Sequence, residues 1–277
     1  MSAEGATVFV KLGGSLITDK TLEATPRLDV IRRLAREVRA ALDAAPGLRV
    51  LLGHGSGSFG HFAARRYGVH LGLAGQGDWR GLAETSAAAA RLNRLVVDAC
   101  LEAGVPALSL QPSASARRRS GALAEMATGP IEAALAHGLV PLVYGDVAFD
   151  DDQGTAIIST EDIFLYLARR IPPNRILMAG IVDGVYESDP LRHPDARRIP
   201  VITPATLAQG LGGLGGSHGT DVTGGMLGKV RALAALVEER PGLRVHFFSG
   251  EIPGRLAEAL LGRETFGTIL RAGGIHE

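Results

Sequence analysis

The sequence predicts an α/β sandwich in which a largely parallel sheet is covered by helices on both faces. Short apolar segments rich in β-branched residues alternate along the chain with longer segments of helical periodicity, a pattern typical of parallel sheets. Glycine-rich turns follow several of the strand-like segments. Because ligands in such folds bind at the carboxyl ends of the strands, these turns are where we expect a site.

The first half of the chain supplies the clearest elements. A strand is predicted over 7–12 (TVFVKL), ending at Gly13-Gly14. Residues 25–47 carry apolar side chains at the spacing of one helical face, with Thr25 as the expected N-cap and Pro26 as the first helical residue. Further strands are expected over 48–53, 105–110 and 139–145, and helices over 82–103 and 130–138.

The second half continues the alternation. A polar turn within residues 146–157 (DVAFDDDQGTAI) indicates a hairpin. Strands are then expected over 175–180, 243–250 and 265–270, and helices over 161–170, about 223–239 and 253–262. No repeat and no linker divides the chain, so we expect a single domain over 1–277.

Composition excludes several classes of protein. The formal net charge is zero, so no overall field recruits nucleic acid or an anionic membrane. The basic run at 117–119 is expected to be a solvated surface loop. No apolar run approaches the ~20 residues that span a bilayer, and the first residues lack a basic, apolar leader. A single cysteine, Cys100, excludes an intramolecular disulfide and, with these features, favours a cytoplasmic protein.

Three glycine-rich turns could bind an anion: residues 11–15, 53–61 and 219–229. Backbone amides in such turns, and the positive end of a following helix, suit phosphate oxygens. None of the three matches the P-loop pattern or a convincing dinucleotide fingerprint. A bound nucleotide would therefore be held in another way.

Lysine is concentrated in these regions. The chain has only three lysines, Lys11, Lys20 and Lys229, against 26 arginines. The other basic side chains of the chain are arginines, whereas the lysines occur in or near the glycine-rich turns. Lysine offers a compact, mobile point charge that can follow a phosphate, so we interpret all three as phosphate-binding candidates rather than as surface charges.

Five segments together resemble the amino acid kinase family: KLGGS, GHGSGSFGH, YGD, VDGVY and DVTGGMLGK, in that order along nearly the whole chain. The resemblance implies a three-layer αβα sandwich and transfer of the γ-phosphoryl group of ATP. It also implies a homodimer. Within the family, GGSLITDK and the histidine that closes GSFGH are most similar to members whose acceptor is itself a phosphate. An acceptor-binding part over about 1–170 and an ATP-binding part over about 171–277 follow from the same resemblance.

The resemblance also assigns roles to individual residues. Lys11 and Lys20 would act on the transferred phosphoryl group, and Asp162 matches an aspartate that holds the catalytic lysines, although the family's SGDD reads STED here. The residues implied to bind ATP are Lys11, Gly13, Gly14, Ser15, Gly57, Asp183, Gly225 and Lys229. Those implied to bind the acceptor are Ser56, His61 and Gly145.

His61 can also be interpreted from chemistry alone. If Ser56 and Gly57 turn the backbone around a phosphate, an imidazole at the end of the loop can donate a hydrogen bond to a phosphate oxygen. A protonated imidazole would do so better, so activity is expected to vary near its ordinary pKa of ~6.5. A capping or core histidine is the alternative for His61, and His54 fits a structural role equally well.

Other functions stay open. The histidines show no metal-ligand spacing, and Mg²⁺ would be held largely by ATP phosphates and water. The apolar part of an acceptor would lie against residues 61–75 and the following helix. A kinase of another small phosphate or phosphonate is one alternative, and a non-catalytic nucleotide or ligand sensor is a second. Glutamate, carbamate or uridylate as acceptor suits the histidine-bearing segment less well.

Overall fold

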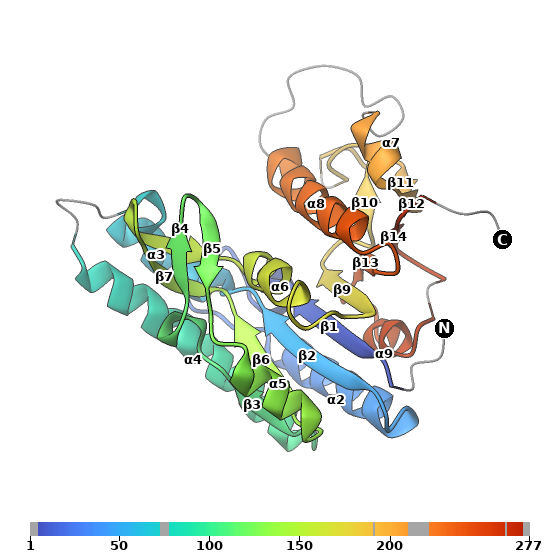
Figure 1. Cartoon of the computed structure of the whole chain (residues 1–277), viewed down its shortest axis with the longest axis horizontal. Helices are drawn as coiled ribbons and strands as arrows, with labels where there is room; N and C mark the ends of the chain where they lie inside the picture. Colours follow the sequence, from blue (N-terminus) through green and yellow to red (C-terminus); the bar gives the residue numbers. More distant parts are fainter. Residues whose placement is uncertain (1–4, 73–77, 191, 210–221, 264, 274–277) are drawn as a thin grey trace.

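A central sheet of eight strands carries helices on both faces (Figure 1). The structure is a computed structural model that describes residues 5–72, 78–190, 192–209, 222–263 and 265–273. Within these residues the strand order is β12-β14-β13-β9-β1-β2-β6-β3, and every neighbouring pair is parallel except β13–β14. The sheet strands are β1 Thr7–Leu12, β2 Arg49–His54, β3 Ala107–Ser109, β6 Val140–Tyr144, β9 Arg175–Gly180, β12 Val201–Ile202, β13 Arg244–Ser249 and β14 Thr268–Leu270.

The helices form the two outer layers, which confirms the predicted αβα class. They are α1 Gly14–Ile17, α2 Leu28–Ala44, α3 Gly57–Tyr67, α4 Arg80–Glu102, α5 Gly129–Ala136, α6 Thr160–Ala168, α7 Pro204–Ala208, α8 Val222–Glu239 and α9 Arg255–Leu260, with short 3-10 turns η1 Val69–Leu71 and η2 Pro112–Ala114. In the described part of the chain, no helix combines the length and the apolar character needed to cross a membrane.

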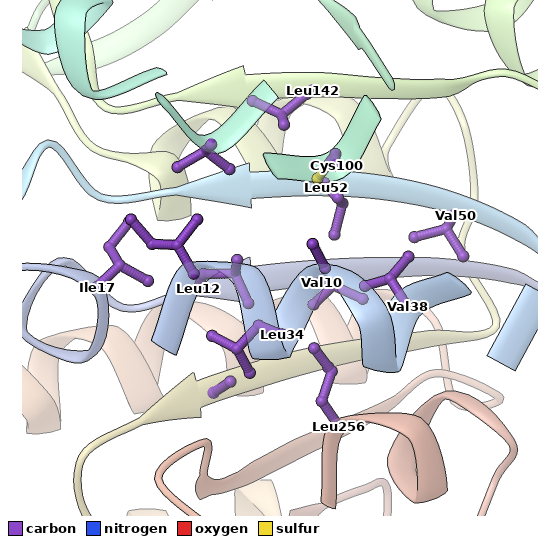
Figure 2. Packing of buried hydrophobic residues seen from close by; sticks show 14 of the residues in the cluster. Val10, Leu12, Ile17, Leu34, Val38, Val50, Leu52, Cys100, Leu142 and Leu256 are labelled. Atoms are coloured by element: carbon purple, nitrogen blue, oxygen red, sulfur yellow. The ribbon is translucent and has the colours of Figure 1, made fainter. Parts of the chain in front are cut away.

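The period-two alternation of β1 separates two hydrophobic cores. Val8 and Val10 face a core shared with α2, α4 and α9, whereas Phe9 faces a core shared with α5, α6 and α8. Figure 2 shows the first core, with Cys100 packed among aliphatic side chains. Burial raises the pKa of the Cys100 thiol to about 12, so this cysteine is a packing residue. By the same alternation Lys11 shares the face of Phe9.

A second sheet of four strands, β5-β4-β7-β8, lies beside the main one. Its strands are β4 Arg117–Arg119, β5 Ala122–Glu125, β7 Asp146–Asp150 and β8 Gly154–Ile158, and β7 and β8 form the predicted hairpin. The expectation of a solvated loop at 117–119 is wrong, because these arginines form β4. Arg117 and Arg119 pair with Asp151 at 2.6 and 2.7 Å, so the acidic hairpin turn neutralises the basic run.

Two other expectations need correction. Helix α2 begins at Leu28, not at Pro26, because residues 18–26 fold back on themselves: Thr18 pairs with Pro26, and the Thr25 amide donates to Ser58 Oγ at 3.2 Å. A further small sheet that periodicity did not indicate is formed by β10 Val185–Tyr186 and β11 Arg198–Ile199.

The glycine-rich segments after β1 and β2 pack backbone against backbone. A Cβ on Gly14 would lie 2.8 Å from both the Cα and the amide nitrogen of Gly57, and Gly57 has a φ of +51°. Thr18 stabilises this contact by bonding to both segments: its hydroxyl donates to Gly14 O at 2.7 Å and accepts from the Ser58 amide at 3.0 Å. These two glycines are therefore required by close approach, in addition to any bound anion.

We expect Gly57→Ala to destabilise the fold more than Gly68→Ala. Both glycines have positive φ, but the space around Gly68 is open, whereas a Cβ on Gly57 would lie 2.8 Å from Thr18 Cγ2. The left-handed conformation alone should cost about 1–2 kcal/mol at each position, and overpacking should add roughly 1–3 kcal/mol at Gly57. Urea unfolding of both variants measures the difference, and equal losses of stability would contradict the steric explanation.

Candidate active site

The carboxyl ends of four neighbouring strands bring the predicted segments together. In the sheet register Lys11 lies beside Gly53 of β2 on one side and Met178 of β9 on the other, and His54 of β2 lies beside Tyr144 of β6. The turns that follow these strands therefore meet at one edge of the sheet, as expected for an α/β fold.

A buried carboxylate holds two of the three lysines. Glu161, in the first turn of α6, lies with Oε1 2.5 Å from Lys11 Nζ and 2.8 Å from Lys229 Nζ. The three side chains come from β1, α6 and α8, so the ion pairs join elements that are distant in the sequence. Figure 1 shows α6 and α8 next to each other, and both pack on the core that Phe9 of β1 faces.

Electrostatics keep this carboxylate ionised. Burial alone would raise the pKa of Glu161, but the charges of Lys11 and Lys229 outweigh burial and hold the pKa at about 2. Burial lowers the pKa of Lys11, while Glu161 opposes that shift. Lys11 and Lys229 therefore place positive charge in a partly desolvated position, where an anionic ligand would be attracted strongly.

Asp162 does not take the position expected for it. Its carboxylate accepts a hydrogen bond from the Ser159 amide at 3.0 Å, and its own amide donates to Ser159 Oγ at 3.0 Å, which together form a capping box at the start of α6. The carboxylate that contacts the lysines belongs to Glu161, the preceding residue. In the STED segment, Asp162 therefore caps α6, and Glu161 forms the ion pairs with the lysines.

Lys20 lies on a loop that is hydrogen-bonded to α3. Arg66 Nη2 donates to both carboxylate oxygens of Glu23 at 2.9 Å, and the Thr25 amide donates to Ser58 Oγ at 3.2 Å. Burial, with the neighbouring charge of Lys229, lowers the pKa of Lys20. Lys20 is consequently placed next to the other two lysines although it lies on an exposed loop.

All three lysines line one cavity, which we call the lysine cavity. Its volume is about 200 Å³, and its lining includes Lys11, Gly13, Gly14, Ser15, Lys20, Glu161, Gly184 and Lys229. Helix α1 begins at Gly14 in its wall, and amides at the start of a helix have no intrahelical acceptor. Lysine ammonium groups and such amides together form a lining suited to phosphate oxygens.

Asp183, predicted to bind ATP, contacts two side chains that are not among the described residues lining the lysine cavity. Asp183 accepts a hydrogen bond from the Tyr186 hydroxyl and lies 3.7 Å from Arg198 Nε. Its neighbours Val182 and Gly184, rather than Asp183, line the cavity. Gly225 lies in the first turn of α8, which begins at Val222, and Lys229 lies further along that helix. The rest of the turn at 219–229, over 219–221, lies outside the described residues.

A second cavity, which we call the histidine cavity, has Ser56 in its lining, the residue before Gly57, which packs on Gly14 of the lysine cavity. Its volume is about 350 Å³, and Ser56, Gly60, His61, Gly145 and Asp146 line it together with Ala64, Arg65, His70, Thr85, Ala89 and Ile157. Ser56, His61 and Gly145, predicted separately to bind the acceptor, therefore share one cavity. His61 lies on helix α3, which begins at Gly57. The expectation that it ends a loop is wrong.

Lysines that line the lysine cavity affect the pKa of His61 in the histidine cavity. Burial and the charges of Lys20, Arg65 and Lys229 lower the pKa of His61. Its imidazole is therefore neutral near pH 7 when the cavities hold no anion. His54, by contrast, is buried, lies 3.2 Å from Asn93 Oδ1 through Nε2 and stacks on Tyr144, so it has a structural role.

The described side chains provide no site built for a metal ion. No group of three or more histidine, cysteine, aspartate or glutamate side chains among them could hold one. Glu161, the buried carboxylate of the lysine cavity, is engaged by two lysines. The cavity thus fits phosphate groups better than a bare cation.

Residues 6–249 match the amino acid kinase family, and the chain belongs to this family. More particularly, it is 38% identical to the isopentenyl phosphate kinase of Methanothermobacter thermautotrophicus, across 94% of this chain and 97% of that protein. It is 37% identical to the isopentenyl phosphate kinase of Haloferax volcanii, across 95% and 98% of the two chains. A solved isopentenyl phosphate kinase structure superposes with a TM-score of 0.81 and 35% identity, across 95% of this chain and 99% of that one.

We expect Glu161→Gln to lower the free energy of unfolding far more than Asp162→Asn. Loss of the carboxylate charge leaves buried Lys11 without its counterion, which typically costs about 3–5 kcal/mol, whereas the cap should cost at most about 1 kcal/mol. Chemical unfolding at pH 7 compares the two variants. A larger effect of Asp162→Asn would assign the lysine-holding role back to Asp162.

The contribution of Glu161 should also depend on pH. Its folded-state pKa lies below the ordinary value, so its stabilising effect is present above about 4.5 and is lost as the pH falls towards about 2. The stability difference between wild type and Glu161→Gln should therefore shrink as the pH is lowered from 6 to 3. A difference that stays constant over this range would contradict the assigned ion pairs.

Proposed function

We propose that the chain transfers the terminal phosphoryl group of ATP to isopentenyl phosphate, giving isopentenyl diphosphate and ADP. One observation carries the proposal: Gly14, in the wall of the lysine cavity, packs directly on Gly57, which follows Ser56 in the wall of the histidine cavity, with no side chain between the two backbones. Two anionic substrates bound in these cavities would meet there. The similarity to isopentenyl phosphate kinases along nearly the whole chain supports this choice of acceptor.

The chemistry is a displacement at phosphorus. A phosphate oxygen of the acceptor forms a bond to the terminal phosphorus of ATP, the bond from that phosphorus to the bridging oxygen breaks, and ADP leaves with the electron pair. Charge develops on the transferred group and on the leaving oxygen, so catalysis depends on placing positive charge beside both. Lys11 and Lys20 take this role in the proposal, while Lys229 and the amides of Gly14 and Ser15 hold ATP phosphates.

Glu161 is a positioning residue in this scheme. It contacts Lys11 and Lys229 directly, and it fixes two flexible side chains before substrate arrives, which lowers the entropic cost of assembling the site. Mg²⁺ would neutralise part of the ATP charge when bound with the nucleotide. Its ligands would be phosphate oxygens and water, because Glu161 is occupied by the two lysines.

The acceptor phosphate is assigned to Ser56, His61 and Gly145. Ser56 lines the cavity and is the N-cap of α3, so an anion bound beside it would lie near the positive end of that helix. His61 would donate a hydrogen bond to a phosphate oxygen, which orients the acceptor for attack and favours a phosphate over a carboxylate. The acceptor tail then lies towards Ala64, Ala89 and Ile157.

The division into two parts also belongs to the proposal. All described residues that line the histidine cavity fall within 1–170, in support of an acceptor-binding N-terminal part. The lysine cavity draws on both halves, because Lys11, Lys20 and Glu161 precede residue 171 while Gly184 and Lys229 follow it. Assembly as a homodimer and a cytoplasmic location stay predictions.

We expect purified protein to release ADP from ATP with isopentenyl phosphate as acceptor. Separate reactions with fosfomycin, glutamate and UMP test the alternatives at equal concentration, and dimethylallyl phosphate tests tolerance of the isomeric tail. Turnover with fosfomycin alone would keep the chemistry but replace the substrate. ATP binding with no turnover on any acceptor would instead support a nucleotide sensor.

The role of His61 predicts a specific pH dependence. Its pKa is lowered in the free protein, so the imidazole gains its proton only below about 6.5. The ratio of kcat/KM for isopentenyl phosphate between wild type and His61→Asn should therefore rise as the pH falls through that range, since kcat/KM reports the free enzyme. Protonation of the acceptor itself cancels in the ratio. His137→Asn, at an exposed histidine that is the C-cap of α5, is the control and should behave as wild type. A flat ratio for His61→Asn would contradict the assignment.

A further inference from the structure

The backbone carbonyl of His54, at the end of β2, accepts two hydrogen bonds from distant parts of the chain. The Gly145 amide, directly after β6, donates to it at 2.9 Å. The Thr160 hydroxyl, at the start of α6, donates to it at 2.7 Å. Because Thr160 is buried, with only 1% of its surface exposed, its hydroxyl depends on this acceptor within the protein. The ends of two strands and the start of a helix therefore meet at one oxygen atom.

His54 is itself held firmly, so its carbonyl is a fixed reference point. The imidazole lies 3.2 Å from Asn93 Oδ1 through Nε2 and stacks on the ring of Tyr144. The residue also belongs to a strand that is paired with β1 on one side and with β6 on the other. A group that bonds to this carbonyl is therefore positioned relative to the central sheet.

The side chain of Thr160 makes two separate contacts with the end of β2. Ser159 and Asp162 form the capping box of α6, which leaves the Thr160 hydroxyl to its bond with His54. The methyl group lies over the preceding residue, since a Cβ on Gly53 would come within 2.6 Å of Thr160 Cγ2. Threonine is branched at Cβ and stiff about χ1, so the two contacts fix the start of α6 against β2.

The residues beside this junction belong to the proposed site. Thr160 directly precedes Glu161, which forms the ion pairs with two lysines of the lysine cavity. Gly145 lines the histidine cavity, and a Cβ on Gly145 would lie 3.6 Å from Thr160 Oγ1. The bonds to His54 O thus join the helix that carries Glu161 to the segment assigned to the acceptor phosphate.

We infer that Thr160 is a positioning residue of the reaction: it sets the place of Glu161, and of the lysines that Glu161 holds, relative to the acceptor phosphate. The inference rests on the proposed function. Thr160 contacts no substrate in this scheme and acts through Glu161 and Gly145. Transfer requires the acceptor oxygen and the terminal phosphorus of ATP to be aligned, and a misplacement of about 1 Å can lower the rate on the order of a hundredfold.

The test removes the hydroxyl of Thr160 and keeps its volume. Thr160→Val places a methyl group where the hydroxyl lies 2.7 Å from His54 O, and a carbon atom cannot approach an oxygen so closely. The start of α6 should therefore move away from β2. We expect kcat with isopentenyl phosphate and ATP to fall about tenfold. The affinities for ATP alone and for isopentenyl phosphate alone, measured by calorimetry, should change much less, because each cavity keeps its own lining.

Thr160→Ser tests the hydroxyl from the opposite side. This variant keeps the bond to His54 and loses only the methyl group over Gly53, so its kcat should stay close to that of wild type. If Thr160→Val does not fold, Thr160→Ala removes the same hydrogen bond without placing a methyl group beside the carbonyl, and it is compared with Thr160→Ser in the same way.

Tyr166→Phe is the matched control on the same helix. The Tyr166 hydroxyl donates to Met126 O at 3.2 Å and accepts from the Met126 amide at 3.1 Å, so its loss also removes buried hydrogen bonds that anchor α6. Tyr166 is not among the described residues that line either cavity. This variant should lower the midpoint of thermal unfolding, as Thr160→Val does, but it should leave kcat unchanged.

The outcomes separate this inference from the proposed function. Absence of turnover in wild type with isopentenyl phosphate would overturn the proposed function, and the inference with it. Turnover in wild type with an unchanged kcat in folded Thr160→Val would overturn the positioning role alone. An equal loss of kcat in Tyr166→Phe, or in Thr160→Ser, would do the same, because the effect would then follow stability and not the bond to His54.

Discussion

The ion pairs of Glu161 with Lys11 and Lys229 are the interaction on which the site depends. They connect the central strand β1 to α6 and α8, three elements that the chain places far apart. A buried ion pair of this kind contributes little net stability, because desolvation offsets the attraction. Its value is positional: it fixes two lysine side chains where an anion must be received, and the buried carboxylate is in turn unable to bind much else.

The backbone contact between Gly14 and Gly57 is the second constraint. It brings the turns after β1 and β2 together, and with them Gly14 of the lysine cavity and Ser56 of the histidine cavity. A side chain at either glycine would push the two turns apart. Transfer between two bound phosphates requires the reacting oxygen and phosphorus to be close and aligned. The distance between these turns therefore affects catalysis as well as packing.

Much of the fold followed from local patterns, whereas part of the site did not. The strand β1, the apolar face of α2, the long helix α4 and the β7–β8 hairpin are local features, and all were predicted. The position of His61 on a helix was missed because glycines in GSGSFG suggest a loop. Glu161 was also missed, although a signal existed: Ser159 and Asp162 have the spacing of a capping box, which assigns Asp162 to the backbone and leaves Glu161 for the lysines. Contacts such as that between Glu161 and Lys229 depend on topology and cannot be derived from spacing.

The concentration of lysine in one cavity has a chemical consequence. Every side-chain amine of the chain belongs to Lys11, Lys20 or Lys229, and all three line the lysine cavity. Amine-directed acylation, whether by a reagent or by a cellular acetyl donor, therefore has no side-chain target on the arginine-rich surface. Lys11 and Lys20, whose pKa values are lowered, present more of the nucleophilic free amine than an ordinary lysine does. A ligand bound in the lysine cavity would therefore protect these amines from acylation, and the degree of protection would report how fully the cavity is occupied.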